Sequence, residues 1–338
     1  MTQIPLVQIS HLEKTFTKDK GIFSPFRFNK GKFQRQQESV YALNGVNLTI
    51  LKGETLCVVG ETGCGKSTLA RTLMGLTPPT SGEIHYLNDR IDHLDDNQRL
   101  LYRRRMQMVF QNPYASLNPR MTVYQTLREA ISFHNPQMKR RNIDEKIEGL
   151  LNSVGLYADA MDRYPHEFSG GQRQRISLAR ALSVEPEFIV ADEPLAALDV
   201  SVQAQVLNLM MDKQEEQDLT YLFITHDLAV VEHFATRVAV MYLGKVCELA
   251  SRETLFSAPK HPYTKALLSA IPRLDTNAPE LIRLSGEVPT PMEKPIGCVF
   301  QARCPDATPR CFSEPPIMKK QKDGSSIACH VHEEDQTS

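Results

Sequence analysis

The sequence lacks long hydrophobic runs and has almost no net charge. None of its apolar stretches approaches the roughly 18 residues that a membrane-spanning helix needs. Its first residues contain no basic segment followed by an apolar core, which is the pattern of a secretory leader. Lys and Arg number 39 and Asp and Glu 40, so charge alone favours neither nucleic acid nor an anionic membrane as a partner. We therefore expect a soluble, cytosolic protein.

A glycine-rich segment between an apolar run and a helical pattern is the most informative feature. Residues 56–59 precede it and residues 69–74 follow it, which predicts a strand, a loop and a helix start. In such a loop, backbone N–H groups converge on nucleotide phosphates, Lys66 supplies positive charge and the Ser67 hydroxyl binds Mg²⁺. We therefore predict a nucleotide-binding loop made of Gly60, Glu61, Thr62, Gly63, Cys64, Gly65, Lys66, Ser67 and Thr68.

Two further apolar runs end in polar side chains. Residues 188–193 predict a buried parallel strand with Asp192 and Glu193 at its C-terminal edge, where open α/β sheets bind ligands. Asp192 is placed to hold magnesium, and Glu193 to deprotonate the water that attacks the γ-phosphate. Residues 221–227 repeat the pattern, and His226 can donate a hydrogen bond to that phosphate. The plain alternatives are acids that solvate a strand end and a structural histidine.

A second pair of glycines lies at a predicted helix start in residues 168–175, with Ser169 as the N-cap. A second anion site on a chain that already has a phosphate loop implies a second subunit. With these motifs the sequence resembles the ATP-binding subunits of ABC transporters. Residues 60–68 match their Walker A loop, Ser169, Gly170, Gly171 and Gln172 their signature, residues 188–193 their Walker B strand, and His226 their switch histidine.

This resemblance implies that two ATPase subunits close head to tail, so that the signature of one chain contacts the γ-phosphate held by the other. It also implies that Gln111 is the Q-loop glutamine, which contacts Mg²⁺ or water, although a polar turn before Pro113 would explain it too. Asp199 matches the D-loop that crosses the dimer interface. The family usually has serine where Ala196 stands, so one hydrogen bond of that loop is expected to be missing.

Phe16 stands where the family places an aromatic ring to stack on adenine, and a phenylalanine can supply that ring. The alternative is a core phenylalanine, with Tyr41 as the stacking residue. Residues 18–37 mix basic side chains with phenylalanines, a pattern compatible with a nucleic-acid loop. A solvated or subunit-facing insertion is the favoured interpretation in a neutral protein.

The fold class that follows is α/β. The resemblance implies a P-loop ABC ATPase with a RecA-like core, an antiparallel β subdomain and a helical subdomain at about residues 112–185. In that region Ile143, Ile147, Leu150, Leu151 and Val154 share one face of a predicted helix. In the family, this subdomain rotates on nucleotide binding and carries the groove for the membrane subunit. We expect a nucleotide-binding domain over residues 1–250 and an extension over residues 251–338.

Prolines interrupt the extension, and residues 261–268, 284–289 and 297–300 resemble the C-terminal region of oligopeptide and dipeptide importer ATPases. Four of the seven cysteines lie there, namely Cys298, Cys304, Cys311 and Cys329. Their wide spacing favours a [4Fe–4S] cluster over zinc, whose sites usually begin with a shorter clip, and the resemblance implies such a cluster. Zinc, free structural thiols, and His330 or His332 as substitute ligands stay open.

We therefore predict a Mg²⁺-dependent ATPase subunit of a bacterial peptide ABC importer, peripheral on the cytoplasmic face of the inner membrane. The implied partners are a second, homologous ATPase subunit, two permeases and a periplasmic binding protein, with no nucleic acid. Nickel, haem or another small cargo stays open, because cargo is read by other subunits. A non-transport ABC ATPase of DNA repair or the ribosome is disfavoured by the single cassette, the lack of heptads and the neutral charge.

Overall fold

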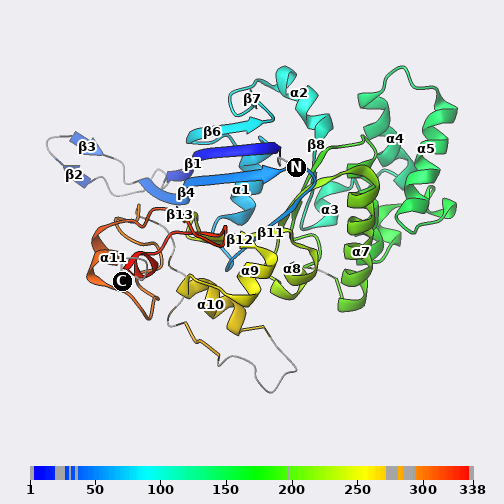
Figure 1. Cartoon of the computed structure of the whole chain (residues 1–338). Coiled ribbons are helices and arrows are strands. Elements are labelled where there is room, and N and C mark those ends of the chain that lie inside the picture. Colours follow the sequence, from blue (N-terminus) through cyan, green and yellow to red (C-terminus); the bar gives the residue numbers. More distant parts are fainter. Residues whose placement is uncertain are drawn as a thin grey trace. The chain divides into compact units, whose positions relative to one another are not determined.

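The computed structural model describes residues 4–19, 27–29, 32–34, 37–196, 198–271, 281–284, 286, 289, 292 and 294–334 (Figure 1). The chain divides into two compact units. Unit 1 contains Met1–Leu6, Ile50–Cys57 and His93–Thr236, and unit 2 contains Val7–Thr49, Val58–Asp92 and Arg237–Ser338. No helix in the described part of the chain combines the length and the apolar character needed to cross a bilayer.

Unit 1 contains parallel strands in the order β8, β9 and β10. Their bounds are Met106–Val109 for β8, Phe188–Asp192 for β9 and Thr220–Ile224 for β10. Every residue of β9 and β10 is buried, as expected for interior parallel strands, so both predicted strands are confirmed. The register pairs Asp192 with Ile224, which brings the residues after β9 and β10 to the same edge.

The helices of unit 1 include one that the periodicity of residues 143–154 predicted, now α5. They are α2 (Asp96–Arg105), α3 (Pro113–Ser116), α4 (Val123–His134), α5 (Arg140–Ser153), α6 (Gly170–Leu182), α7 (Val200–Gln217) and α8 (Leu228–Phe234), with 3₁₀ turns η1 (Ala158–Ala160) and η2 (Pro165–Glu167). Figure 1 shows α4 and α5 side by side. Leu127 and Ile131 of α4 pack with Ile147 and Leu151 of α5 in a core that also takes in Ile176 of α6.

Unit 2 contains an antiparallel sheet in the order β4, β1, β6 and β7, as the resemblance implied (Figure 1). The bounds are β1 (Pro5–Asp19), β4 (Gln37–Leu51), β6 (Ser81–Tyr86) and β7 (Asp89–Arg90), with a hairpin of β2 (Arg27–Asn29) and β3 (Lys32–Gln34). Strand β5 (Thr55–Val59) passes from unit 1 into unit 2 between Cys57 and Val58.

The C-terminal part of unit 2 adds short elements to a second antiparallel arrangement, in the order β11, β12, β14 and β13. The remaining bounds of unit 2 are α1 (Lys66–Leu73), β11 (Arg237–Tyr242), β12 (Lys245–Ser251), α9 (Arg252–Ser257), α10 (Pro262–Ser269), α11 (Pro309–Ser313), β13 (Lys319–Lys320), β14 (Ser326–Ile327) and α12 (Val331–Glu334). Because β14 pairs with β12, residues beyond 250 extend a sheet that begins before that position.

Several residues of the sequence analysis lie outside the described residues. They include residues 20–26, 30–31 and 35–36 of the basic and aromatic segment, Ala197, which follows Ala196, and residues 285, 287 and 288 of the extension.

Candidate functional site

The predicted phosphate loop of unit 2 follows β5 and leads directly into α1. Gly60, Gly63 and Gly65 adopt positive φ angles of 154°, 83° and 106°. A Cβ atom would lie 2.1 Å from the Met241 carbonyl oxygen at Gly60 and 2.4 Å from the Ala42 carbonyl oxygen at Gly65. Only glycine fits these two positions without a backbone shift. A Cβ at Gly63 would meet nothing within 4 Å, so the loop is open on that side.

Lys66 begins α1 and is buried, with 5% of its surface exposed. Its Nζ donates to the carbonyl oxygen of Gly60 at 2.6 Å and to that of Glu61 at 3.0 Å. No side chain caps the N-terminus of α1, whose first N–H groups precede any helical partner. The ammonium of Lys66 therefore lies beside N–H groups that no side chain caps, in a loop that is open at Gly63. This combination of positive charge and hydrogen-bond donors suits the phosphates of a nucleotide.

In unit 1 the predicted catalytic residues meet at one carboxylate. Glu193 follows β9 with a left-handed φ of 46°, and its N–H donates to the carbonyl oxygen of Ile224 at 2.9 Å. The Gln111 Nε2 donates to the Glu193 Oε2 at 2.9 Å, and the His226 Nδ1 lies 3.5 Å from the same oxygen. The Glu193 side chain is 14% exposed and that of His226 56%, so the carboxylate is largely enclosed while the imidazole faces solvent. The neighbouring Asp192 is buried, with 4% exposed.

An aspartate that the sequence analysis missed fixes the turn carrying His226. The Asp227 carboxylate caps α8 by accepting hydrogen bonds from the N–H groups of Ala229 at 2.9 Å and Val230 at 3.4 Å. An aspartate directly before an apolar helical pattern is a recognisable N-cap signal, so this residue was within reach of sequence reasoning.

The signature residues form the start of α6, and the predicted N-cap is confirmed. The Ser169 hydroxyl accepts from the Gln172 N–H at 3.3 Å, and the Gln172 side-chain oxygen accepts from the Ser169 N–H at 3.0 Å. This reciprocal capping box holds Gly170 and Gly171 in the first turn. A Cβ at Gly171 would lie 2.2 Å from Cγ1 of Val202, so α6 and α7 approach closely there.

Asp199 caps the next helix of unit 1, α7. Its Oδ1 accepts hydrogen bonds from the Val202 N–H and from the Ser201 hydroxyl, each at 3.0 Å. These hydrogen bonds hold the pKa of the Asp199 carboxyl below its ordinary value. The side chain is therefore an anion at a helix start.

Phe16 lies on β1 with 44% of its surface exposed. The Nζ of Lys14 lies 5.0 Å from the centre of its ring. The structure thus excludes the core alternative for Phe16, and its contact with adenine stays a prediction. Tyr41, on β4, is half-buried.

A family model for ABC transporters matches residues 43–196, and a model for the C-terminal region of oligopeptide/dipeptide transporters matches residues 247–311. Over 325 residues the chain is 49% identical to the oligopeptide transport ATP-binding protein AppF of Bacillus subtilis, covering 95% of this chain and 98% of AppF. The chain belongs to the ABC transporter ATP-binding proteins of the oligopeptide and dipeptide family. It is also 47% identical over 335 residues to the dipeptide transport ATP-binding protein DppF of Escherichia coli, covering 99% and 96% of the two chains.

A solved structure of a dimeric ATP-binding cassette, in a post-hydrolysis state with ADP and Pi, is similar in fold to this ABC protein. The TM-score is 0.62 at 29% identity, with 73% of this chain and 98% of the other covered. The P-loop ABC fold predicted from the motifs is thus confirmed. This ABC protein is a Mg²⁺-ATP-dependent ATPase.

The predicted iron–sulfur cluster is wrong. In the described residues, which include Cys298, Cys304, Cys311 and Cys329, no group of three or more Cys, His, Asp or Glu side chains could hold a metal ion. Burial raises the pKa of the Cys298 and Cys329 thiols, and that of Cys304 to about 11. Spacing along the chain did not reveal either fact.

The two histidines considered as substitute ligands contact backbone carbonyls. The His330 Nε2 lies 2.9 Å from the Glu314 carbonyl oxygen, and the His332 Nε2 lies 2.9 Å from that of Lys260. These contacts tie the end of the chain to earlier parts of the extension.

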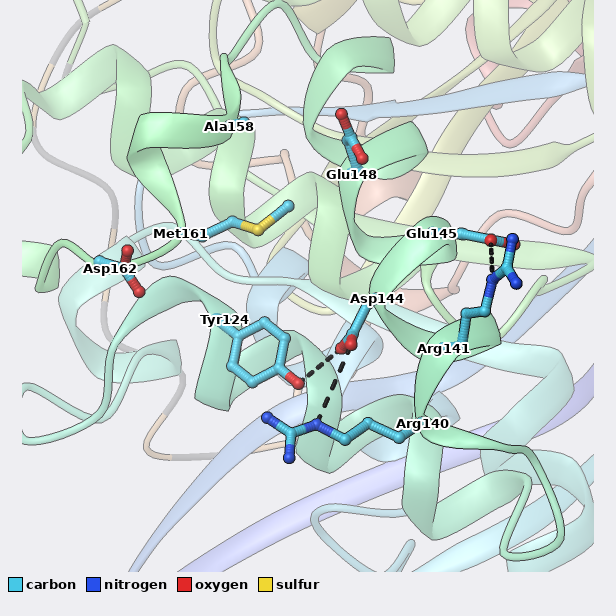
Figure 2. Close-up of a pocket in the computed structure, with 9 residues that line it drawn as sticks. All are labelled: Tyr124, Arg140, Arg141, Asp144, Glu145, Glu148, Ala158, Met161 and Asp162. Atoms are coloured by element: carbon cyan, nitrogen blue, oxygen red, sulfur yellow. Dashed lines mark hydrogen bonds and ion pairs between the residues drawn. The ribbon is translucent and has the colours of Figure 1, made fainter.

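A pocket of about 430 Å³ opens in unit 1 beside α4, α5 and η1 (Figure 2). Figure 2 shows the Tyr124 hydroxyl donating to Asp144 Oδ1, at 2.6 Å, and Arg141 Nε donating to Glu145 Oε1, at 2.9 Å. The charged side chains of its lining are Arg140, Arg141, Asp144, Glu145, Glu148 and Asp162. Acidic groups outnumber basic ones, so the pocket favours a basic or polar occupant.

Proposed function

We propose that this ABC ATPase powers the uptake of dipeptides or oligopeptides as a subunit of a bacterial importer at the cytoplasmic face of the inner membrane. The observation that carries the proposal is identity of 47–49% over nearly the whole chain to proteins named for dipeptide and oligopeptide transport. The match of residues 247–311 to the C-terminal region of such transporters supports it. We propose the division into a nucleotide-binding domain, 1–250, and an extension, 251–338.

We propose that the loop over residues 60–68 binds the phosphates of ATP, with Lys66 supplying positive charge. Ser67, Gln111 and Asp192 are the proposed ligands of Mg²⁺, which neutralises phosphate charge when bound. Phe16 is the proposed adenine contact. The phosphate loop supports its role through its positive-φ glycines and the enclosed ammonium of Lys66.

Glu193 is proposed as the general base. Because Gln111 and His226 contact Oε2, the Glu193 Oε1, which has no partner among the described residues, is left to accept the proton of the attacking water. The Gln111 amide orients the carboxylate, and the exposed His226 is proposed to donate to the γ-phosphate. Ser169, Gly170, Gly171, Gln172 and Asp199 are proposed to act across a head-to-tail dimer with a second ATPase subunit.

The proposed partners are this second ATPase, two permeases and a periplasmic binding protein. ATP binding closes the ATPase dimer and hydrolysis reopens it, which passes motion to the permeases. The acidic pocket beside α5 supports a role as the docking site of a permease segment, because it is open, polar and formed by the helices after Gln111 (Figure 2).

Capture of partners tests this assignment. Tagged Glu193→Gln protein is isolated from detergent-solubilised native membranes in Mg²⁺-ATP, because a chain that hydrolyses slowly stays clamped to its partners, and mass spectrometry identifies them. We expect a second ATPase and two permeases. Recovery of ribosomal or DNA-repair proteins without any permease would contradict the proposal.

A second variant in the same experiment tests the pocket. Glu148→Lys, added to Glu193→Gln, reverses a charge in the lining and is expected to reduce the recovery of permeases but not of the second ATPase. Glu129→Lys, an exposed change on α4 away from the lining, is the matched control. Equal recovery of permeases with both variants would place the docking site elsewhere.

A further inference from the structure

An arginine of the C-terminal extension reaches the phosphate loop. The Arg303 Nη1 donates to the Glu61 Oε2 at 2.5 Å, and its Nη2 donates to the Glu61 Oε1 at 3.1 Å. The Arg303 side chain is 7% exposed and that of Glu61 28%, so this two-point ion pair is largely shielded from water. Such bidentate pairs fix geometry as well as charge.

The backbone of Glu61 is held by a second residue from the same region. Its N–H donates to the Tyr263 hydroxyl oxygen at 2.8 Å. Tyr263, on α10, is fully buried, and its ring lies 4.8 Å from the ring of Tyr242 and 5.3 Å from that of Phe300, centre to centre. The N–H of Arg303 donates to the Phe300 carbonyl oxygen at 3.0 Å, so the arginine projects from a turn anchored in this aromatic cluster.

Glu61 presents an electrostatic difficulty that Arg303 removes. A carboxylate in a loop that receives a triphosphate repels it, and the repulsion is strong where water is excluded. The guanidinium cancels that charge, and its hydrogen bond to Glu61 in turn raises the pKa of Arg303. Arg303 Nη1 also donates to the Tyr242 hydroxyl at 3.4 Å, which orients the guanidinium toward the loop.

We propose that Arg303 is a positioning residue for ATP binding: it neutralises Glu61 and, with Tyr263, fixes the start of the phosphate loop. The C-terminal extension thereby sets the affinity of the loop for ATP. This inference rests on the proposed role of residues 60–68 in binding ATP.

Nucleotide binding by full-length variants tests it, with Mg²⁺-ATP competing against a fluorescent ATP analogue. For Arg303→Gln we expect an increase in the Kd for ATP on the order of tenfold, since a charged hydrogen-bond partner is lost and the Glu61 charge is left unpaired. Glu61→Gln removes the ion pair with Arg303 but also the repulsion between the Glu61 carboxylate and the phosphates, so the increase in the Kd for ATP is expected to be smaller than in Arg303→Gln. The double variant is expected to match Glu61→Gln alone.

The weakening in Arg303→Gln is expected to shrink at high salt, which screens the unpaired carboxylate. Arg303→Lys restores the charge but not the two-point geometry, so its Kd is expected between those of wild type and Arg303→Gln. The matched control is Arg310→Gln, which removes an exposed pair with Glu314 in the same extension and is expected to leave the Kd unchanged.

A folded Arg303→Gln chain with the wild-type Kd would overturn the inference, as would a double variant weaker than either single one. Thermal unfolding without nucleotide shows whether Arg303→Gln folds. If it does not fold, Arg303→Lys is the test, and a wild-type Kd for ATP in Arg303→Lys would then overturn the inference. Lys66→Ala separates this inference from the proposed function. Normal ATP binding by Lys66→Ala would contradict the proposal that residues 60–68 bind the phosphates of ATP.

Discussion

At the residue scale, His261 is a buried side chain of the extension that makes the stability of the fold depend on pH. It is 1% exposed, its Nδ1 accepts from the Tyr263 N–H at 3.1 Å, and its own N–H donates to the Glu248 Oε2 at 2.9 Å. Burial, with a smaller contribution from the charge of His332, lowers the pKa of His261 to about 3. The folded protein therefore holds the ring neutral. Only a ring with an unprotonated Nδ1 can accept the hydrogen bond from the Tyr263 N–H at the start of α10.

The free energy of unfolding should fall in acid because of this group. The folded pKa lies below the unfolded value of about 6.5, so the stabilisation is complete above that pH and is lost as the pH falls toward 3. From pH 6.5 to 5 we expect a loss of ~2 kcal/mol from His261. His261→Asn keeps a capping side chain without titrating, and is expected to flatten this dependence in urea unfolding. The same pH slope in wild type and variant would contradict the assignment.

Single residues differ in how far the sequence could reveal them. Glu193 and His226 follow strands that the sequence predicted, whereas Gln111 was identified through the family resemblance. Their meeting at one carboxylate follows from parallel strands that end at one edge. Arg303 could not be found, because its partner Glu61 is 242 residues away and only tertiary folding joins them. The cysteine prediction failed for a related reason, since spacing along a chain fixes neither burial nor ligand geometry.

At the element scale, α4 and α5 form the clearest link between periodicity and packing. Ile143, Ile147 and Leu151 point into the core of unit 1, where they meet Leu127 and Ile131. The periodic pattern predicted the existence of α5, while its start at Arg140 lay before the first apolar position. No periodic pattern in the sequence predicted the strand order β11, β12, β14 and β13, because pairing between strands is set by tertiary contacts.

Two changes on α5 should act in opposite directions. Ile147→Ala removes a fully buried side chain and is expected to reduce the free energy of unfolding by about 2–5 kcal/mol. Gly149→Ala, in the same helix, adds a methyl group that meets no atom within 4 Å beyond the neighbouring backbone of that helix, and is expected to raise the free energy of unfolding by up to about 1 kcal/mol. Urea unfolding measures both. A loss of stability in Gly149→Ala comparable to that in Ile147→Ala would contradict this account of the helix.

At the scale of the whole molecule, the chain distributes its chemistry over both units. Residues proposed to bind phosphates lie in unit 2, and those proposed to activate water lie in unit 1. Strand β5 carries the chain from one unit to the other just before the phosphate loop. The family could be inferred from sequence because each motif is local, whereas the contact of the extension with that loop emerges only in the folded unit.

Peptide uptake is the measurement that tests the central proposal most directly. Cells of the source bacterium that lack this chain are complemented with wild type or with Glu193→Gln at equal abundance, and the uptake of a labelled dipeptide is followed. The account predicts that wild type restores uptake and Glu193→Gln does not, because the variant lacks the base that activates water. Uptake that is indifferent to the chain, or that Glu193→Gln restores fully, would contradict it.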